Sequence, residues 1–433
     1  MNPSIIIHRG THQIGGCITE IRTNTSRIII DFGSNLPGTD HLSSKSDEQL
    51  VEEVFGHRAC KAVLFTHYHG DHIGLYKMIP PGIPLYIGAT AKKILTVLTE
   101  KLDGISEAKG LPIIKAMNTY SIGKWISFGD IQVKPLLVDH SALDSYMFLI
   151  KAAGKTILFT GDFREHGIAG EHNRLERMLR TYGESNIDVL ITEGTMLSRI
   201  DENKAGEIIT EEDLGRKARE IFGKVENKHI FVLVSSTNVD SIMEFYHAVP
   251  EDMAFACDAY QAEIMKIAMD DKGTYYRKYK PAYIRNRRRN IYVVGDKAMK
   301  GLNREDGFWP ADFDKMREKG FVMLIRANDK FEEILRRFAD VNPLIIYSMW
   351  RGYLHGKCKD EKLVEFLGNY RTEYLHTSGH AYIASIRKVI DTVKPKIIIP
   401  MHTECADTLK TLDEFSAYAD RIKAYKDGDI IEV

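Results

Sequence analysis

Four metal-binding side chains are crowded into six residues that directly follow a short apolar run, His67-Tyr68-His69-Gly70-Asp71-His72. Imidazole and carboxylate groups together suit zinc or a similar divalent cation. In an extended segment His67 and His69 point to the same side, so both can bind one ion. Gly70 permits the sharp turn that would aim Asp71 and His72 at a second position. The spacing therefore indicates a metal site, and one that suits two ions.

The elements that would position this cluster are short apolar runs that end at a titratable residue. Such runs precede five further residues: Asp31, His140, Asp162, Glu193 and His402. Runs of this length without polar alternation are typical of strands covered on both faces. Ligands and catalytic groups collect beyond strand ends, where loops meet a rigid sheet. We therefore expect these residues to gather at one edge of a sheet scaffold.

Composition excludes some function classes. The chain has 433 residues, 44% of them hydrophobic and 27% charged, with a net charge of −1, which is typical of a globular protein of two or three domains. Nucleic acid would have to be bound by a local basic patch. No apolar run is long enough for a membrane span and no signal peptide is recognisable, so no membrane partner is predicted.

The cysteines indicate a reducing compartment. The five are dispersed and form no CxxC pair. An odd, dispersed set favours reduced thiols, and a cytoplasmic location is predicted. Cys405 lies near His402 in the sequence, but the favoured interpretation is a buried structural thiol.

The middle of the chain differs from its two ends. Helical stretches alternate there with strand-like runs at 230–234, 253–257, 292–294, 321–325 and 344–347. This alternation predicts an α/β domain with a parallel sheet. The metal-site pattern resumes at His376–His380 and His402. We therefore predict a first domain, residues 1–200 and 371–433, interrupted by an inserted domain, residues 201–370.

The order of these motifs resembles the metallo-β-lactamase superfamily. Asp31 stands at the family's first motif, the HxHxDH cluster at the second, His140 at the third and Asp162 at the fourth. The long insertion resembles the β-CASP group of nucleases. Its motifs A, B and C match Glu193 in Thr-Glu-Gly-Thr, His380 in His-Thr-Ser-Gly-His-Ala, and His402 in Pro-Met-His-Thr-Glu. The chain is similar to ribonuclease J and RNA 3′-end-processing endonucleases, which implies an αββα sandwich with an inserted β-CASP α/β domain.

The same resemblance implies a ligand set. His67, His69 and His140 would hold one ion, Asp71, His72 and His402 the other, and Asp162 would bridge them. The implied cofactors are two divalent ions, with zinc first and manganese or magnesium as alternatives. Two such ions can share a water molecule and lower its pKa. Asp31 is expected to accept an imidazole N–H or to hold the loop, and a turn residue at the strand end is an equal alternative.

Catalysis beyond the metals is assigned to a histidine and a carboxylate. The predicted catalytic residues are His380, Glu193, Asp71 and Asp31. Protonation of the leaving oxygen is assigned to His380, with Glu193 orienting its ring, and a core histidine is the alternative. Ser378 and Gly379 are expected to bind phosphate before a helix. Ser235 and Ser236 are a second predicted phosphate site, for which an ordinary helix N-cap is at least as good an interpretation.

A basic stretch within the inserted domain is the candidate RNA-binding segment. Tyrosines are interleaved with cations over residues 275–289, and the predicted RNA-binding residues are Arg285, Arg287, Arg288 and Arg289. Cations that follow phosphates and rings that stack on bases suit a single strand, although a solvated charged loop explains the composition equally well. The inserted domain is expected to cover the metal site, which would favour unpaired RNA.

Three functions are compared. A ribonuclease acting on single-stranded RNA is preferred, because His402 in motif C is the choice of the RNA-processing members of the group. A nuclease acting on DNA is the first alternative. A small-molecule hydrolase is disfavoured, since it needs neither the insertion nor the Glu193–His380 pair. Internal or 5′-exonucleolytic cleavage, and a monomer or a homodimer, are left open.

Overall fold

The computed structural model describes residues 2–36, 39, 45–56, 59–102, 110–170, 174–199, 209–224, 226, 228–270, 290–295, 299 and 301–433. The chain forms two compact units. The first contains Met1–Glu165, Ala169–Ile208 and Gly379–Val433, and the second contains His166–Ile168 and Ile209–Ser378. Every metal-ligand candidate from the sequence belongs to the first unit.

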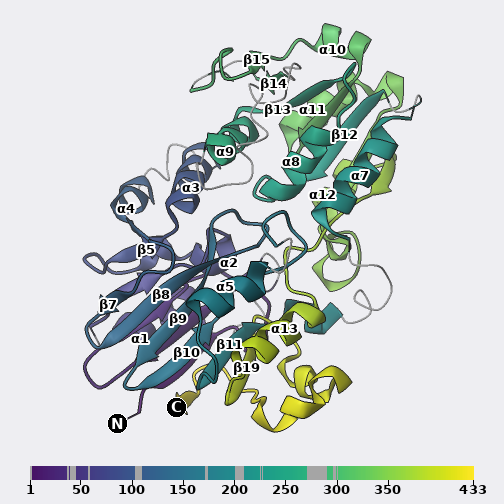
Figure 1. The fold of residues 1–433 in the computed structure, drawn as a ribbon. Coiled ribbons are helices and arrows are strands. Elements are labelled where there is room, and N and C mark those ends of the chain that lie inside the picture. The colour runs from purple at the N-terminus through teal and green to yellow at the C-terminus, as the bar shows by residue number, and fades with distance from the viewer. Residues whose placement is uncertain are drawn as a thin grey trace. The chain divides into compact units, whose positions relative to one another are not determined.

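The first unit is built on two sheets (Figure 1). In spatial order, one sheet contains β20 (Ile430–Glu432), β1 (Ser4–Arg9), β2 (Ile18–Arg22), β3 (Arg27–Ile30), β4 (Ala62–Leu64), β5 (Leu85–Ile87) and β6 (Asn118–Thr119). The other contains β19 (Ile397–Met401), β11 (Val189–Glu193), β10 (Lys155–Phe159), β9 (Ser145–Ala152), β8 (Ile131–Val138) and β7 (Ile126–Phe128). The α-helices that the structure describes in this unit are α1 (Asp47–Phe55), α2 (Gly70–Ile73), α3 (Ala89–Leu102), α4 (Gly110–Ala116), α5 (Arg174–Tyr182) and α13 (Ile383–Val393).

Strand alternation gives this unit its layers. Ile157 and Phe159 of β10 belong to the apolar core between the two sheets, whereas Leu158 belongs to the core beneath α5 and α13. On the other sheet, Arg27 of β3 donates to the carbonyl of Val54 in α1, so α1 covers that sheet's outer face. Both sheets are therefore buried on two sides, which explains their unbroken apolar runs. The layers confirm the predicted αββα sandwich.

The strand directions bring the titratable residues to one edge of each sheet. β10, β11 and β19 run parallel, and β3 runs parallel to β4. The carboxyl ends of parallel strands meet at the same edge of a sheet, so Asp162, Glu193 and His402 emerge together. Asp31 and His67 emerge together from the other sheet in the same way.

The second unit is an α/β domain around one parallel sheet. In spatial order its strands are β15 (Phe308–Pro310), β14 (Ile291–Val294), β13 (Ala254–Asp258), β16 (Phe321–Ile325), β12 (His229–Val234), β17 (Leu344–Ser348) and β18 (Arg371–Tyr374). Among its described residues, the α-helices are α7 (Glu211–Phe222), α8 (Val239–Ala248), α9 (Ala259–Asp270), α10 (Phe313–Lys319), α11 (Asp329–Arg337) and α12 (Glu361–Leu367). All strand pairs in this sheet are parallel, which confirms the predicted parallel sheet.

The second unit differs from the expected inserted domain in its bounds. Its main segment is Ile209–Ser378, whereas the sequence suggested 201–370. At the carboxyl end the difference has a physical reason, because β18 pairs with β17 and so joins the sheet of the second unit. At the amino end, residues 201–208 lie outside the described part of the chain.

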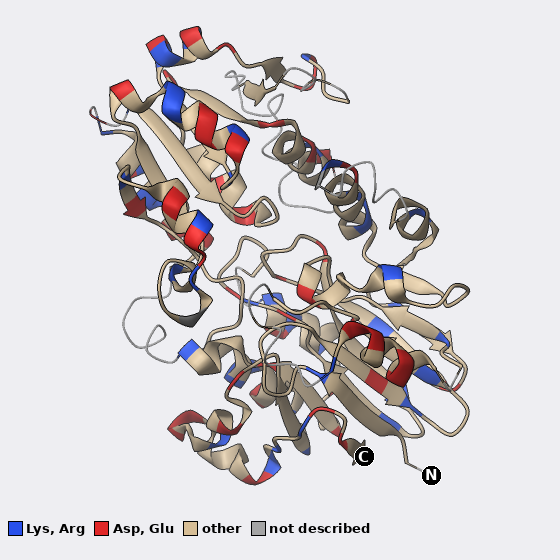
Figure 2. Cartoon of the chain, turned by 180° about the vertical axis from the view of Figure 1, so that it is seen from behind, with Lys and Arg blue, Asp and Glu red and all other residues tan. Residues whose placement is uncertain are grey.

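Charges of both signs are interspersed on the helices of each unit (Figure 2). Arg216 pairs with Glu220 on α7, and Arg387 pairs with Asp391 on α13. Such mixing agrees with the net charge of −1. Among the described residues, no helix combines the length and apolar character that a bilayer crossing requires.

Candidate metal centre

The short helix α2, which carries Asp71 and His72, is docked by backbone hydrogen bonds. The amides of Cys17, Phe32 and Ser34 donate to the carbonyls of Asp71, His72 and Gly70 over 2.9, 2.8 and 2.9 Å. Residue 33 must be glycine for its backbone to lie this close to the backbone of Asp71, since a Cβ there would lie 1.8 Å from the Asp71 carbonyl oxygen. The loop geometry is thus fixed before any side chain binds a cation.

Three histidines form the first group of ligand atoms. The ring nitrogens of His67, His69 and His140 all lie within 4.8 Å of one another. Nε2 of His140 is 3.3 Å from Nδ1 of His69. His67 follows β4 and His140 follows β8, so two different sheets supply this group.

A second group lies beside the first. Nε2 of His402 is 3.2 Å from Oδ2 of Asp71, and Nε2 of His72 is 3.9 Å from the same oxygen. These three residues are the ones that the resemblance assigns to a second ion. Their donor atoms are as close as ligands that share a cation, since two ligands ~2.1 Å from zinc at a tetrahedral angle are about 3.4 Å apart.

Asp162 lies between the two groups. Its Oδ2 is 3.9 Å from His67 Nε2 and 4.0 Å from His140 Nε2 in the first group. The same oxygen is 3.2 Å from His72 Nε2 and 3.9 Å from His402 Nε2 in the second group. A carboxylate with ring nitrogens from both groups at these distances has the position of a bridging ligand.

The buried polar atoms of the cluster fit a metal site. Within the described part of the chain, His67 Nε2, His72 Nε2 and Asp162 Oδ1 are buried and have no hydrogen-bond partner. An unsatisfied buried polar atom lowers the free energy of unfolding by about 1–3 kcal/mol. An arrangement that leaves three such atoms without partners therefore needs an explanation. A cation bound among these atoms would satisfy all three, and the donor set is the one that divalent transition metals prefer.

The outward ring nitrogens are held by hydrogen bonds. Nδ1 of His72 is 2.8 Å from Asp31 Oδ2, and Nδ1 of His140 is 2.7 Å from the Gly379 carbonyl. The hydroxyl of Thr66 lies 3.0 Å from Nδ1 of His67. A hydrogen bond at Nδ1 directs Nε2 of each ring into the site, as in known metal centres. Asp31 thus contacts an imidazole, the first of its two expected roles.

Electrostatics favour neutral imidazoles in the first group. Burial is the main cause that holds the pKa values of His67 and His140 well below the usual value. Burial also lowers the pKa of His69 to about 4. Neutral imidazole is the form that binds a metal, so this group needs to release no proton near pH 7.

Opposite charges stabilise each other in and beside the second group. Burial alone would lower the pKa of His72, but the surrounding negative charges, Asp162 first, raise it well above the usual value. For Asp162 burial would raise the pKa, but nearby histidines, His402 first, lower it well below the usual value. A buried region that stabilises added positive charge in this way also suits a divalent cation.

Two site residues have a strained backbone. Asp31 has a φ of 60° and His402 a φ of 54°, in the left-handed region that side chains with a Cβ rarely adopt. Each directly follows a strand and turns its side chain into the cluster. Strain of this kind costs on the order of 1–3 kcal/mol and gathers at functional sites.

Glu193 and His380 form a contact beside the metal ligands. Oε2 of Glu193 is 3.1 Å from Nδ1 of His380, while Oε1 accepts hydrogen bonds from the amides of Phe163 and Ala381 over 2.9 and 3.2 Å. Burial would lower the pKa of His380, but the charges of Glu193 and Asp162 outweigh it and raise the pKa. Glu193 therefore holds both the ring of His380 and the backbone that follows Asp162.

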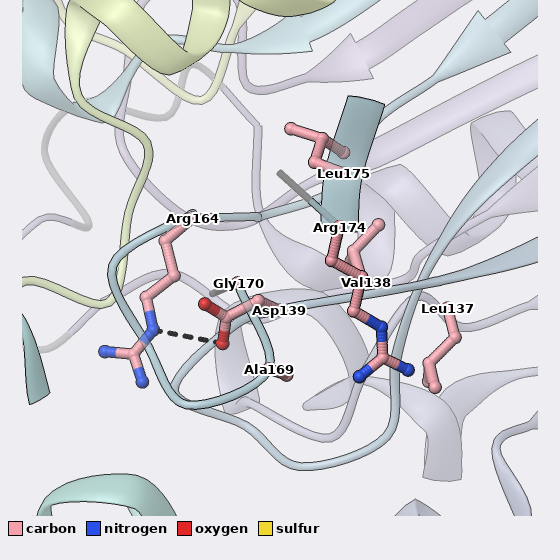
Figure 3. Close-up of a pocket in the computed structure, with 8 residues that line it drawn as sticks. All are labelled: Leu137, Val138, Asp139, Arg164, Ala169, Gly170, Arg174 and Leu175. Carbon is pink, nitrogen blue, oxygen red and sulfur yellow. Dashed lines mark hydrogen bonds and ion pairs between the residues drawn. The ribbon is translucent and has the colours of Figure 1, made fainter. Parts of the chain in front are cut away.

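A buried ion pair links two ligand loops (Figure 3). Asp139 precedes His140, and its Oδ1 lies 3.4 Å from Nε of Arg164, two residues after Asp162. The amide of Arg164 also donates to the Asp139 carbonyl over 2.8 Å. Both side chains line a small pocket together with Arg174 of α5. This pair fixes the loop of His140 relative to that of Asp162.

Ser378 and Gly379, which were expected to bind phosphate at the start of a helix, do not lie at a helix start. The helix α13 begins at Ile383, four residues after Gly379, and Tyr382 is its N-cap. The carbonyl of Gly379 is bound by His140, and a Cβ at 379 would lie 2.7 Å from Ser141 Oγ. Ser378 belongs to the second unit, and its carbonyl accepts from His166 Nε2 over 2.6 Å.

Ser235 and Ser236 also lie in the second unit, in the turn after β12. Asn238, not either serine, caps α8 by accepting from the Ser241 amide. The predicted RNA-binding residues Arg285, Arg287, Arg288 and Arg289 lie outside the described residues.

Threonine and cysteine side chains also lie at the site, and the sequence did not indicate them. The hydroxyl of Thr195 lies 2.8 Å from Nδ1 of His402 and 3.2 Å from Nδ1 of His380, and Thr66 holds His67. The ligand atoms of Cys17, His72 and His402 lie within 4.8 Å of one another. Thr195 stands in the same four-residue motif as Glu193, and this proximity was the available signal.

Two family models match the chain. Residues 18–191 match the metallo-β-lactamase superfamily, a range that contains every site residue up to Asp162. Residues 369–425 match the model described as a Zn-dependent metallo-hydrolase RNA specificity domain, a range that contains His380 and His402.

Similar proteins span most of the chain. Ribonuclease J of Helicobacter pylori is 22% identical over 476 residues, which cover 98% of this chain and 60% of that protein. Ribonuclease J of Sinorhizobium meliloti is 23% identical over 398 residues, covering 86% of this chain and 62% of that protein. The chain thus spans about 60% of the length of these curated relatives.

A solved structure shows the same fold. The crystal structure of a protein of unknown function from Enterococcus faecalis matches with a TM-score of 0.72 and 19% identity, and the match covers 100% of both chains. Together, the two family models and these curated relatives show that the chain belongs to the metallo-β-lactamase superfamily and is similar to the ribonuclease J proteins.

Proposed function

We propose that this chain is a metal-dependent ribonuclease that hydrolyses phosphodiester bonds of single-stranded RNA, internally, from the 5′ end, or both. The observation that carries the proposal is the position of Asp162, whose Oδ2 lies within 4.0 Å of ring nitrogens of both ligand groups. The relatives named Ribonuclease J and the match to an RNA specificity domain support RNA as the substrate.

The proposed cofactors are two divalent ions, zinc in the first place and manganese or magnesium as alternatives. His67, His69 and His140 would hold one, Asp71, His72 and His402 would hold the other, and Asp162 would lie between them. When bound, such a pair supplies a water molecule that is nucleophilic at neutral pH and neutralises charge on the phosphate. Asp31 acts through His72, whose ring it orients.

The chain's own groups complete the reaction. Cleavage leaves a charged 3′-oxygen that must be protonated. Nδ1 of His380 faces Glu193, so Nε2 is the atom that we assign to deliver the proton. Its side chain is 21% exposed, so solvent can return a proton to the ring after each turnover.

Substrate contacts remain part of the proposal. Ser378, Gly379, Ser235 and Ser236 are assigned to phosphates, and Arg285, Arg287, Arg288 and Arg289 to the RNA backbone. Tyrosines interleaved with other cations precede these arginines in the sequence, and aromatic rings suit a single strand because its unpaired bases can stack on them. A cytoplasmic location is proposed with this function.

The test is cleavage of end-labelled single-stranded RNA and DNA by the purified protein, with and without a chelator. Substrates with monophosphate, triphosphate and hydroxyl 5′ ends, and a blunt duplex, complete the set. The proposal expects chelator-sensitive cleavage of unpaired RNA, with product lengths that distinguish internal from 5′-end cleavage. Cleavage of DNA alone would replace the proposal with a DNA nuclease, and cleavage of neither polymer would leave a small-molecule hydrolase.

A further inference from the structure

Cys17 is a buried thiol that lies next to the second ligand group. Its side chain is 1% exposed, and its Sγ is within 4.8 Å of the ligand atoms of His72 and His402. We propose that Cys17 is a further ligand at this position and makes it select zinc over magnesium. The proposal rests on the proposed metal site and names a residue outside the ligand set that the family resemblance implies.

The backbone fixes Cys17 and Asp71 together. The Cys17 amide donates to the Asp71 carbonyl over 2.9 Å, and the Cys17 carbonyl accepts from Gly33 over 3.1 Å. Nε of the buried Arg9 donates to the carbonyl of Gly16, the preceding residue, over 2.7 Å. The hydrogen bonds that position the carboxylate of Asp71 therefore also position the thiol.

A second observation at this position points to a cation. Nε2 of His72 is buried and, among the described residues, makes no hydrogen bond of suitable geometry, although Oδ2 of Asp162 lies 3.2 Å away. A small pocket is lined by Cys17 and by four polar site residues, His72, Asp162, Glu193 and His402. Packing in the core, where Cys17 joins Met401, explains its burial but not the unsatisfied imidazole nitrogen beside it.

The donor set determines which cation fits. Thiolate, imidazole and carboxylate together are ligands of zinc, whereas magnesium takes oxygen ligands. Binding breaks the S–H bond of Cys17, forms a sulfur–metal bond and releases the proton to solvent. The position should therefore bind zinc or cobalt more tightly than manganese or magnesium, and the preference should depend on one sulfur atom.

Cobalt(II) is the probe for the test, since a thiolate ligand adds an intense near-ultraviolet charge-transfer band that imidazole and carboxylate ligands lack. Metal-free protein is titrated with cobalt, and the charge-transfer band and the visible ligand-field bands are recorded. Wild type should show both. Cys17→Ser and Cys17→Ala should lose the charge-transfer band and keep the ligand-field bands. Two control variants, Cys257→Ala and Cys405→Ala, should keep both kinds of band. Cys257 is a buried cysteine of the second unit.

The outcomes separate this inference from the proposed function. Ligand-field bands without a charge-transfer band in wild type would overturn the role of Cys17 while a metal site remains. A charge-transfer band that persists in Cys17→Ala would do the same. No cobalt bands at all would overturn the metal site itself. Zinc affinity gives a second readout: it should fall in Cys17→Ser, while manganese affinity is retained.

Discussion

Oε2 of Glu193 lies 3.1 Å from Nδ1 of His380, and the other oxygen of the same carboxylate binds the amides of Phe163 and Ala381. One buried side chain thus connects the loop of Asp162 with the segment that carries His380. The ring is held by its Nδ1, which leaves Nε2 for the proton transfer proposed above. Because Nδ1 also lies 3.6 Å from Oδ2 of Asp162, a role in metal binding is the alternative that must be tested.

Replacement of His380 by Ala should slow turnover and leave bound metal in place. We expect kcat to fall by ~10²–10⁴-fold, the loss typical of a general acid. Cleavage rates at saturating RNA and metal content by elemental analysis are the two measurements. His355→Ala, which removes an exposed histidine of the second unit, is the matched control. Loss of metal from His380→Ala would make this residue a ligand instead.

Replacement of Asp162 by Ala should remove nearly all activity, because a bridging carboxylate positions both ions and the nucleophile between them. Metal content should fall together with the cleavage rate. Asp130→Ala, at an exposed position, should change neither. A variant at 162 that binds metal and cleaves RNA like wild type would exclude the bridging role.

Replacement of Arg164 by Met should weaken metal binding, although Arg164 is not among the predicted ligands. The pair with Asp139 holds the loops of His140 and Asp162 together, and removal of such a supporting partner typically costs about 10–100-fold in metal affinity. Chelator competition measures this affinity, and Arg164→Lys should recover part of it. Arg180→Met on α5, where the side chain is 70% exposed, is the control. Equal affinity in Arg164→Met and wild type would contradict the account.

Neutralising Arg285, Arg287, Arg288 and Arg289 together should weaken RNA binding and flatten its salt dependence. On a single strand, every phosphate that the protein no longer neutralises reduces the slope of log K against log salt by about 0.7. Binding measured over a salt series tests this, and the cleavage rate at saturating RNA should change little. An unchanged slope would identify the segment as a solvated charged loop.

Glu20 should stabilise the first unit in a pH-dependent way. Its carboxylate is 4% exposed and lies 2.9 Å from Nη1 of Arg27, with His8 Nε2 at 3.2 Å. Burial would raise the pKa of Glu20, but the hydrogen bonds from His8 and Arg27 outweigh it and lower the pKa below 4.5. A lowered pKa in the folded state stabilises the fold above the unfolded pKa, and this stabilisation is lost as the pH falls through the folded pKa.

Glu20→Gln should therefore melt at a lower temperature than wild type at pH 7, and the difference should shrink below a pH of about 4.5. Because glutamine still accepts a hydrogen bond, the loss should not exceed the ~3–5 kcal/mol of a broken buried ion pair. Glu220→Gln, which changes a side chain that is 64% exposed, should melt like wild type. A difference that stays constant from pH 7 to pH 3 would contradict the assignment.

Local patterns were sufficient to predict buried strands and the clustering of the ligand candidates, whereas the layers of the αββα sandwich were implied by the family resemblance. Unbroken apolar runs predict buried strands, and the carboxyl ends of parallel strands meet. The positions of Cys17, Thr195 and Arg164 at the site depend on tertiary distances instead. Cys17 lies 55 residues from His72 in the sequence, and nothing in its neighbours marks it as part of the site.

The expected helix start near Ser378 illustrates the limit of local patterns. The sequence suggests a turn into a helix there, yet α13 begins at Ile383. The intervening backbone is used for tertiary hydrogen bonds, since the Gly379 carbonyl binds His140 and the Ala381 amide binds Glu193. Local helix propensity could not reveal that these backbone groups would bind distant side chains and not one another.

The central claim is a two-ion site bridged by Asp162, and the number of metal ions per active chain tests it most directly. Protein purified without chelator is analysed for bound metals, then stripped and reloaded with zinc while cleavage of single-stranded RNA is followed. The account predicts two ions per chain, loss of cleavage on stripping and its recovery on reloading. Fewer than one ion per chain in protein that still cleaves RNA would contradict it.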